Sequence, residues 1–311
     1  MKSCFITGSN GFIGSRLAEF LLKKDIDVYG TIRNKNERIA YLSGKMTTFE
    51  CDILNRQKLE EILSEVKPDV VFHLAAQSKV DPSWQDPEST LKVNVLGTLH
   101  LLDAIKQFCP NSVVFVVGAA AIYGSSKDQT PIDENHEMIA SSPYAVSKIA
   151  QDYLAGLYWP AYGMKVIRIR PFNITGPGNM GDACSDFAKG IIAIEKGEAR
   201  SLRVGDLDSV RDITDVRDAV EALWLLAKKG VSGSVYNLCS GKGYHVGSLL
   251  DDLINLSGLK VDIVQDTAKK RLLKDRFQIG DNSQLLSLGW QPIVPIRKTL
   301  SDMLAYWRAL S

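Results

Sequence analysis

Short apolar runs alternate with segments of helical spacing along the first half of the chain. Runs rich in Val, Ile and Phe, which are typical of buried strands, lie at Ser3 to Thr7, Asp27 to Thr31, Thr48 to Cys51, Val70 to Leu74, Val113 to Gly118 and Val166 to Arg170. Between them, one helical face carries Ile13, Leu17, Phe20 and Leu21, and another carries Val95, Leu99, Leu102 and Ile105. This alternation predicts a parallel sheet covered by helices on both faces.

The predicted fold is therefore α/β, a doubly wound Rossmann-type sheet with a smaller C-terminal lobe. After Arg170 the pattern loosens into GPGNMGDA, two helical stretches and a short strand at Val235 to Leu238. We assign residues 1–172 to the dinucleotide-binding domain, with 207–240 returning to it. Residues 173–206 and 241–311 form the predicted substrate lobe. No repeat or long linker separates this lobe from the dinucleotide-binding domain, so we expect the two to be interwoven.

Charge and cysteine usage argue against several classes of function. Lys and Arg total 37 against 36 Asp and Glu, and this balance indicates neither nucleic acid nor a membrane surface as a partner. The five cysteines include no C-x-x-C pair and the four histidines show no ligand spacing, so we expect no metal site. The N-terminal residues contain no apolar run long enough for a signal peptide or a membrane span. We expect a cytoplasmic protein with reduced thiols.

The first predicted strand ends in a glycine-rich turn, TGSNGFIG, at Thr7 to Gly14. Glycines at this spacing let the backbone turn tightly and approach a pyrophosphate at the positive end of the next helix. Some glycine turns only pack a helix against a strand, but this one opens a strand–turn–helix unit, the context that dinucleotide binding requires. The predicted contacts are Gly8, Asn10, Gly11, Phe12, Ile13 and Gly14.

The end of the second predicted strand bears on the choice of cofactor. A carboxylate there would bind the ribose 2′-hydroxyl of NAD, whereas an arginine accommodates the 2′-phosphate of NADP. This chain has Arg33 and no acid at that point, with Lys35 and Arg38 following. NADP(H) is thus favoured over NAD(H), although arginines after a strand are often only solvated. Asp52, past the third strand, is either a contact to the adenine amino group or a plain turn aspartate.

A tyrosine and a lysine lie four residues apart at the start of a predicted helix, in the segment SPYAVSK. The bare spacing recurs elsewhere in the chain, but here Ser142 suits an N-cap and Pro143 suits the first helical position. Tyr144 and Lys148 therefore share one helical face. The Lys148 ammonium and the helix N-terminus would both favour a phenolate, so we expect the pKa of Tyr144 to fall from about 10 towards neutrality, as a general acid/base requires.

Together these motifs resemble the extended short-chain dehydrogenase/reductases that modify nucleotide sugars, the NAD-dependent epimerase/dehydratase family. The resemblance lies in TGSNGFIG, FHLAAQS, SPYAVSK and RPFN. The second half is most similar to the GDP-4-dehydro-6-deoxy-D-mannose reductases, in RPFNITGPGN, SDFAKGI, VGDLDSVRDITDVRDAVEA, VYNLCSGKGY and GWQPIVPIRKTLSDMLAYWR. The resemblance covers essentially the whole chain.

The resemblance implies that Tyr144 protonates the sugar C4 oxygen as the nicotinamide delivers hydride to C4, and that Lys148 tunes the tyrosine and binds the nicotinamide ribose. The third member of the family's catalytic set, a Ser or Thr, corresponds to Ala119, which cannot donate a hydrogen bond. Losing such a donor costs roughly 10²–10³ in rate, unless Ser125 or a bound water replaces it, or the residue was changed to trap a substrate. Ala120 and Ala121 supply no acid for dehydration, so reduction or 4-epimerisation is favoured.

The resemblance also extends the predicted dinucleotide site beyond the glycine turn. Asn94, at the start of a helix, either binds near the nicotinamide or caps its helix. The other expected contacts are Ile53, Leu74, Ala75, Ala76 and Pro171, together with Tyr144 and Lys148.

A nucleotide diphosphate needs cationic and amide donors, and bidentate arginine suits phosphate best. Arg211, Arg271 and Asn173 match family positions that face the diphosphate or sugar. The alternative for Arg211 is a salt bridge with Asp212 or Asp215, and for Arg271 it is a solvated charge run. Gln77, Ser78 and Ser83 either line the sugar pocket or hydrogen-bond to loop backbone. Ile174 and the segment 182–184 depart from the reductase pattern, which leaves the sugar and the base open.

The leading hypothesis is an NADPH-dependent reductase of the C4 keto group of a nucleotide-linked 4-keto-6-deoxyhexose, with GDP-4-dehydro-6-deoxy-D-mannose as substrate. One alternative is a nucleotide-sugar 4-epimerase that keeps NAD bound; another, because of Ala119, is a catalytically weak nucleotide-sugar or dinucleotide-binding protein. If the chain follows its relatives, the helices from Val93 to Ile105 and from Tyr144 to Tyr158 pair in a homodimer. Core packing explains their apolar faces equally well.

Overall fold

The computed structural model describes residues 1–34, 37–126, 129–266 and 276–310. The chain divides into two compact units. The first unit comprises Met1–Ile122, Glu137–Pro171 and Val220–Asn237, and the second comprises Tyr123–His136, Phe172–Ala219 and Leu238–Ser311. This division differs from the predicted one, because the returning segment spans 220–237 instead of 207–240, and because residues 123–136 and Phe172 belong to the second unit.

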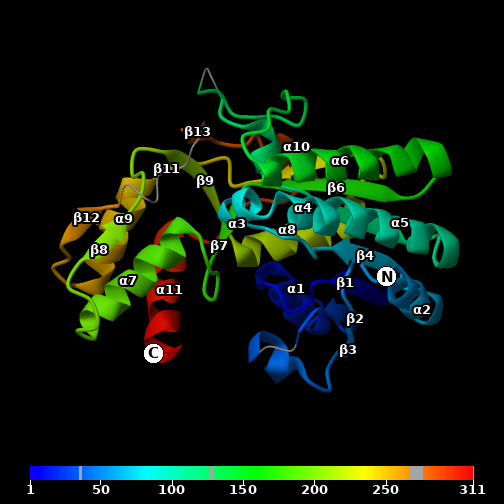
Figure 1. The fold of residues 1–311 in the computed structure, drawn as a ribbon, viewed down its shortest axis with the longest axis horizontal. Helices are drawn as coiled ribbons and strands as arrows, with labels where there is room; N and C mark the ends of the chain where they lie inside the picture. The colour runs from blue at the N-terminus through cyan, green and yellow to red at the C-terminus, as the bar shows by residue number, and fades with distance from the viewer. Residues whose placement is uncertain (35–36, 127–128, 267–275, 311) are drawn as a thin grey trace. The chain divides into compact units, whose positions relative to one another are not determined.

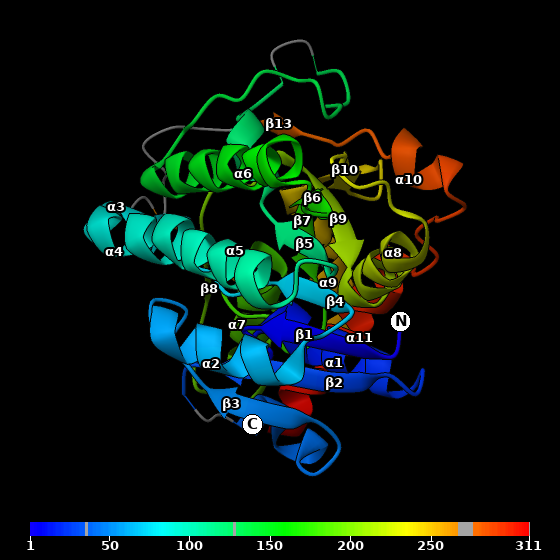
Figure 2. The ribbon, with the colours of Figure 1, turned by 90° about the vertical axis from the view of Figure 1, so that its right-hand side faces the viewer.

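A seven-stranded sheet forms the centre of the first unit (Figures 1 and 2). Its order is β10-β6-β5-β4-β1-β2-β3, and the pairs from β6 through β3 are parallel. The strands are β1 (Ser3–Thr7), β2 (Asp27–Ile32), β3 (Thr47–Glu50), β4 (Val70–His73), β5 (Val113–Val117), β6 (Val166–Pro171) and β10 (Val235–Leu238). The predicted doubly wound sheet is confirmed, with every predicted strand within one residue of its observed ends.

Helices cover both faces of this sheet (Figure 2). On one face, α2, α5 and α6 enclose a core of buried apolar side chains that includes Leu59, Leu101 and Ala155. On the other face, α1 and α8 meet where Phe20 packs edge-on to Trp224. The helices of this part of the chain are α1 (Phe12–Leu22), η1 (Glu37–Leu42), α2 (Arg56–Val66), α3 (Val80–Gln85), α4 (Pro87–Leu91), η2 (Lys92–Leu96), α5 (Gly97–Phe108), η3 (Ala120–Tyr123), α6 (Pro143–Tyr162) and α8 (Val216–Lys229).

The strand order reverses between β1 and β4, since the chain winds outward from β1 in one direction and from β4 in the other. In doubly wound sheets, ligands bind beyond the carboxyl ends of the strands at this reversal. The glycine turn follows β1 and the FHLAAQS segment follows β4, so the predicted dinucleotide residues flank the reversal.

The second unit has its own small sheets and its own core. Strand β9 is central: β11 pairs with it antiparallel, whereas β7 and β13 pair with it in parallel. Helices α7, α9 and α11 enclose a second cluster of buried apolar residues. The elements are β7 (Asn173–Thr175), α7 (Ala183–Glu195), β8 (Leu202–Val204), β9 (Val210–Asp215), β11 (Gly243–His245), α9 (Val246–Ser257), β12 (Ile263–Gln265), β13 (Phe277–Gln278), α10 (Ser283–Ser287) and α11 (Ile296–Leu310).

All five cysteines lie in the described ranges, and each is buried and free. Within those ranges the longest apolar helices still fall short of what a membrane span requires. The same residues contain no group of three His, Cys, Asp or Glu side chains arranged to hold a metal ion.

Candidate active site

The glycine turn after β1 leaves no room for side chains at Gly8 and Gly14. Gly8 has φ +69°, a conformation that side chains disfavour, and a Cβ there would lie 3.0 Å from the Ala75 backbone. A Cβ on Gly14 would overlap the carbonyl oxygen of Gly8. Gly11 precedes α1 as its N-cap and makes no side-chain capping bond. The first N–H groups of α1 are therefore available to an anion at the positive end of the helix.

Hydrogen bonds fasten this turn to the end of β2. The Ser9 N–H donates to the carbonyl of Thr31 (2.9 Å), and the Asn10 amide donates to the carbonyl of Asn34 (2.7 Å). Arg33 is exposed beside them, and the Arg38 guanidinium lies 6.0 Å from the centre of the Phe12 ring. Two arginines thus flank the end of β2, where an adenosine 2′-phosphate would lie in a Rossmann fold. Lys35 lies outside the described residues.

The loop after β4 is fastened to the same strand end. The Thr7 hydroxyl accepts hydrogen bonds from the N–H groups of Leu74 and Ala75, both at 3.1 Å. Ala76 follows directly in this loop. Asp52 accepts from the N–H of Leu54 (2.8 Å), the local turn that was one of its two predicted roles, and Ile53 is buried.

Tyr144 and Lys148 both lie on α6, whose start matches the prediction. Ser142 is the N-cap, its hydroxyl accepting from the N–H of Ala145 (3.1 Å), and Pro143 opens the helix. Both reactive side chains are buried, with 7% of Tyr144 and 2% of Lys148 exposed. The Lys148 ammonium lies 6.0 Å from the centre of the Tyr144 ring. The spacing therefore places the predicted pair together.

The predicted fall in the pKa of Tyr144 is wrong. Burial raises the pKa of the phenol above its ordinary value, because the phenolate would lose its hydration. Burial also lowers the pKa of Lys148 to about 7. Its ammonium donates to the carbonyl of Val117 (3.1 Å) and to the side-chain oxygen of Gln151 (2.8 Å). A protonated phenol at neutral pH is suited to donate a proton to a substrate oxygen.

Ala119 follows β5 and is almost fully buried. Ser125, one of the suggested substitutes for the missing hydroxyl, exchanges two hydrogen bonds with Phe277: its hydroxyl donates to the Phe277 carbonyl (3.1 Å) and accepts from the Phe277 N–H (3.0 Å). That hydroxyl is therefore committed to holding two backbone segments together. A bound water remains the candidate for the missing donor.

Gln77 and Ser83 make hydrogen bonds to nearby backbone, which was one of their two predicted roles. The Gln77 amide donates to the carbonyl of Lys79 (2.9 Å) and to the hydroxyl of Thr90 (3.1 Å). The buried Ser83 hydroxyl donates to the carbonyl of Val80 and accepts from the N–H of Tyr144 (3.1 Å). Ser83 thereby supports the first turn of α6. Ser78 is exposed.

Asn94 neither opens nor caps a helix, because α4, η2 and α5 follow one another without a break. It is fully buried in the π-helical turn η2. Its amide accepts from the N–H of Gln77 (2.8 Å) and donates to the carbonyl of Gln77 (3.0 Å) and to the hydroxyl of Ser147 (2.9 Å). Asn94 thus ties the loop after β4 to α6.

In the second unit, the predicted diphosphate residues lie on paired strands. Asn173 on β7 donates to the carbonyl of Asp212 (3.0 Å), and Arg211 on β9 is half-buried and donates to the carbonyl of Val210 (3.0 Å). The carboxylates suggested as alternative partners of Arg211 are engaged elsewhere. Asp215 pairs with Arg217, and Asp212 accepts from the N–H groups of Ser240 and Gly241. Arg271 lies outside the described residues.

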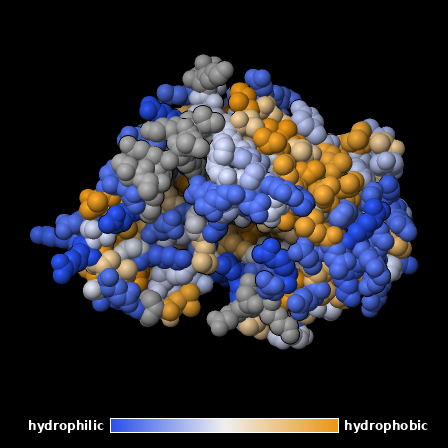
Figure 3. Space-filling model, viewed as in Figure 1, coloured by the Kyte–Doolittle hydropathy of each residue, from blue (hydrophilic) through white to orange (hydrophobic). Residues whose placement is uncertain are grey.

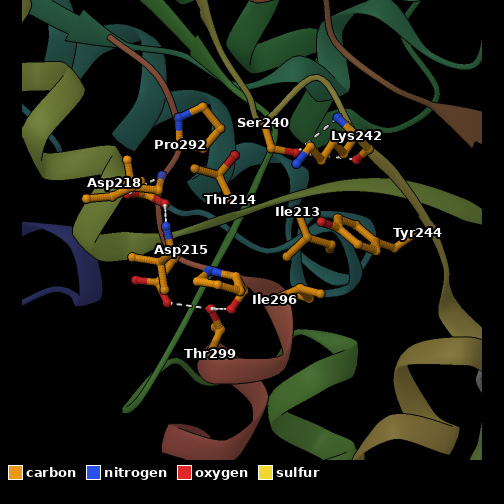
Figure 4. A pocket seen from close by; sticks show the side chains of 13 residues that line it. Ile213, Thr214, Asp215, Asp218, Ser240, Lys242, Tyr244, Pro292, Ile296 and Thr299 are labelled. Atoms are coloured by element: carbon orange, nitrogen blue, oxygen red, sulfur yellow. Dashed lines mark hydrogen bonds between the residues drawn. The ribbon is translucent and has the colours of Figure 1, made fainter.

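A cavity of about 160 Å³ lies within the second unit and was not predicted (Figure 4). It opens between β9, the Ser240–Tyr244 loop and the Pro292–Ile296 segment. Two carboxylates on its wall have partners: Asp215 accepts from the Thr299 hydroxyl, and Asp218 accepts from two backbone N–H groups. The buried Thr214 hydroxyl has none among the described residues. Local sequence gives no signal for such a cavity, since three distant segments form it.

Sequence reasoning also missed three buried polar residues behind the Tyr144–Lys148 pair. His73, Thr98 and Gln151 lie on β4, α5 and α6 and are linked by hydrogen bonds. The sequence did contain a sign of them, because each is a polar residue inside an otherwise apolar strand or helix face. Periodicity alone does not distinguish such a residue from one that faces solvent.

With this geometry established, the chain can be compared with known proteins. The model of the GDP-mannose 4,6-dehydratase family matches residues 5–303. The chain belongs to this family. It is a nucleotide-sugar-modifying enzyme of the short-chain dehydrogenase/reductase type, which confirms the predicted family.

Three similar proteins illustrate the range of reactions among its relatives. The chain is 32% identical to a GDP-6-deoxy-D-mannose reductase of Pseudomonas aeruginosa, over 98% of this chain and 97% of the relative. A solved structure of RMD from Pseudomonas aeruginosa complexed with NADPH is 30% identical, with a TM-score of 0.88 and full coverage of both chains. A UDP-glucose 4-epimerase of Thermus thermophilus in complex with NAD is 25% identical, with a TM-score of 0.89, over 99% of this chain and 100% of the other.

Proposed function

We propose that this enzyme uses NADPH to reduce the C4 keto group of GDP-4-dehydro-6-deoxy-D-mannose. The observation that carries the proposal is the buried, protonated Tyr144 phenol beside Lys148, on the helix that follows β5 of a dinucleotide-type sheet. Full-length similarity to a reductase of that sugar class supports the choice of substrate.

Different residues of the chain would bind the cofactor, transfer the proton and bind the substrate. The turn from Gly8 to Gly14 and the N-terminus of α1 would hold the pyrophosphate, and Arg33 and Arg38 would hold a 2′-phosphate. The bound dinucleotide would supply the hydride. Tyr144 would donate its proton to the C4 oxygen, and Lys148 would stabilise the charge that develops on the phenol oxygen. Asn173, Arg211 and Arg271 would bind the GDP-sugar.

Preference for NADP(H) rests on the two arginines that flank the end of β2. The NADPH complex of a relative agrees with this preference, whereas the epimerase relative was solved with NAD. A 4-epimerase is therefore the second candidate, since the same tyrosine and lysine could serve both directions of hydride transfer. An epimerase would first need the phenolate as a base, whereas a reductase needs only the protonated phenol as an acid.

The test mixes the purified protein with NADPH and GDP-4-dehydro-6-deoxy-D-mannose and follows the absorbance of the reduced nicotinamide. We expect stoichiometric oxidation. Tyr144→Phe removes the proton donor and should lower kcat by roughly 10²–10⁴ while leaving NADPH affinity largely intact. A large loss of NADPH binding in this variant would show instead that the tyrosine is structural.

Restoring the missing hydroxyl at Ala119 gives a second test of the reductase. Ala119→Ser adds a donor to the developing oxyanion and should raise kcat, by as much as roughly 10²–10³. Ala305→Ser makes the same chemical change at an exposed residue of α11 and should leave kcat unchanged. Absence of oxidation in both the wild type and Ala119→Ser would contradict the reductase. Tightly held NAD in the purified protein, with interconversion of a C4-epimeric sugar pair, would point to the epimerase.

A homodimer in the cytoplasm is also proposed. Apolar side chains gather on the surface over α4 to α6 (Figure 3), where Val146, Tyr153 and Leu157 line one exposed face of α6, and Leu96 is exposed in η2. Contiguous exposed apolar patches of this kind mark association surfaces. The five free, buried thiols are consistent with a reducing compartment.

A further inference from the structure

A line of buried hydrogen bonds connects the glycine turn to Lys148. The Thr7 hydroxyl lies 2.8 Å from Nδ1 of His73, and Nε2 of His73 lies 2.8 Å from the Thr98 hydroxyl. The amide of Gln151 donates to the same Thr98 hydroxyl (2.7 Å) and its oxygen accepts from the Lys148 ammonium (2.8 Å). All five side chains are almost fully buried. Water therefore does not compete for these bonds.

The direction of each bond follows from the donors available. Thr7 already accepts two backbone N–H groups, so its hydroxyl proton goes to Nδ1 of His73, which leaves the proton of the neutral ring on Nε2. The Thr98 hydroxyl donates to the carbonyl of Asn94 (2.7 Å), so it must accept from both His73 and Gln151. The amide nitrogen of Gln151 then faces Thr98. Its oxygen has to face Lys148, since an ammonium can only donate.

We propose that Gln151 is a positioning residue for Lys148: its amide, held in one orientation by Thr98 and His73, fixes the Lys148 ammonium against the end of β5 and joins it to the β1 turn. The role of Lys148 in catalysis rests on the proposed function, but the placement of its ammonium does not. The Lys148 ammonium donates to two acceptors, the Gln151 side chain and the Val117 carbonyl. Without Gln151, only the Val117 carbonyl would remain.

The charges around Lys148 make this neutral partner significant. Tyr144 on its own helix and His73 on β4 are the titratable groups that bear on it, and burial keeps both uncharged at neutral pH. Charged groups on the other elements packed against α6 have partners of their own or are exposed. Glu88 pairs with Lys92, Asp103 with Lys106, and Arg168 and Arg170 with Asp152, whereas Asp81 is exposed.

An amide therefore holds the ammonium without adding a charge. A carboxylate at this place would hold Lys148 charged, whereas an apolar side chain would remove the hydrogen bond that favours its charged form. Titration of Lys148 near neutrality, to which burial brings its pKa, thus depends on the amide of Gln151. In this chain Gln151, which influences the protonation of Lys148, lies one helical turn away on the same helix.

The experiment measures the titration of Lys148 directly, by carbon NMR of protein labelled at the lysine ε-carbon. The resonance is assigned through its absence in Lys148→Arg. Gln151→Glu should raise the midpoint by about one unit or more, and Gln151→Met, similar in size, should lower it. Gln107→Glu places the same added charge on an exposed residue of α5 and should leave the midpoint unchanged. If Gln151→Met does not fold, Thr98→Val replaces it, because this substitution removes the hydroxyl that orients the Gln151 amide.

Opposite shifts in the two Gln151 variants support the proposal, because admission of water to a loosened site would raise the midpoint in both. An unchanged midpoint in Gln151→Glu, or a rise in both variants, overturns it. In the NADPH assay, Gln151→Met should lower kcat by about tenfold through misplacement of the ammonium. Because the NMR measurement needs no substrate, opposite shifts without NADPH oxidation would reject the reductase and retain the positioning role. Oxidation of NADPH without opposite shifts of the Lys148 midpoint would support the reductase and reject the positioning role of Gln151.

Discussion

At the scale of single residues, burial decides how the ionisable groups beside the glycine turn behave. Tyr144, Lys148 and His73 are all withdrawn from water, and each is held towards its uncharged form. Spacing along α6 predicted that Tyr144 and Lys148 would meet. It could not predict the pKa of either, because desolvation depends on the strands and helices that pack over the side chains.

His73 should make the stability of the protein depend on pH. Burial lowers its pKa to about 3, from 6.5 in the unfolded chain. Below about pH 6.5 the unfolded state therefore binds a proton that the folded state excludes, and stability falls as the pH falls towards the folded pKa. At 1.36 kcal/mol per pH unit, about 2 kcal/mol should be lost between about pH 6.5 and pH 5.

Urea unfolding at several pH values measures this loss. His73→Gln removes the titrating ring, so its unfolding free energy should fall by about 2 kcal/mol less than that of the wild type over the same pH interval. His245→Gln, an exposed control, should retain the wild-type dependence. Equal dependence in all three proteins would mean that the folded chain protonates His73 as readily as the unfolded chain does.

At the scale of elements, the β1 turn and α1 depend on the absence of a side chain at Gly14. A methyl group there would overlap the Gly8 carbonyl that accepts from the Gly11 N–H. Gly14→Ala should lower the unfolding free energy by about 2 kcal/mol and weaken NADPH binding at least tenfold. Urea unfolding and the quenching of protein fluorescence by NADPH measure the two effects.

Gly247 gives a matched control for Gly14. It also lies in the first turn of a helix, α9, and a Cβ there would make only an ordinary contact with the Leu207 carbonyl. Gly247→Ala should change stability by less than about 1 kcal/mol, because alanine suits a helix and its Cβ would clash with nothing. Similar losses in both variants would indicate that helix propensity, and not the close approach at Gly8, governs this position.

Elements differ in how far local pattern could predict them. Strands β1, β4 and β5 were predictable because both faces of a parallel sheet are apolar, and each of these strands is an almost unbroken run of buried apolar residues. Strand β9 was not, since Arg211, Asp212 and Asp215 interrupt its pattern. Its buried carboxylates are satisfied by Ser240, Gly241, Arg217 and Thr299, which are distant in sequence or follow the strand. Apart from Arg217, these partners lie outside any local window around the strand.

At the scale of the whole molecule, the exchange of chain segments between the two units was predicted but its boundaries were not. Residues 123–136 belong to the second unit because Ile132 bridges to Gly280 and the Ser126 N–H donates to the carbonyl of Phe277. These pairs are about 150 residues apart, and their local sequence resembles an ordinary loop after β5. Motifs indicated the candidate cofactor and catalytic residues, whereas long-range pairing decided which unit each segment joined.

Association through α6 provides a test at the same scale. Leu157 is 56% exposed on the apolar face of α6, and Leu286 is 48% exposed on α10 in the second unit. Leu157→Arg would place a charge in the proposed interface, where it would be desolvated without a partner, and should raise the dimer dissociation constant at least tenfold. Leu286→Arg adds the same charge elsewhere and should leave association unchanged. Sedimentation velocity over a range of protein concentrations distinguishes the two, and a monomeric wild type would show that the α6 face is not a dimer interface.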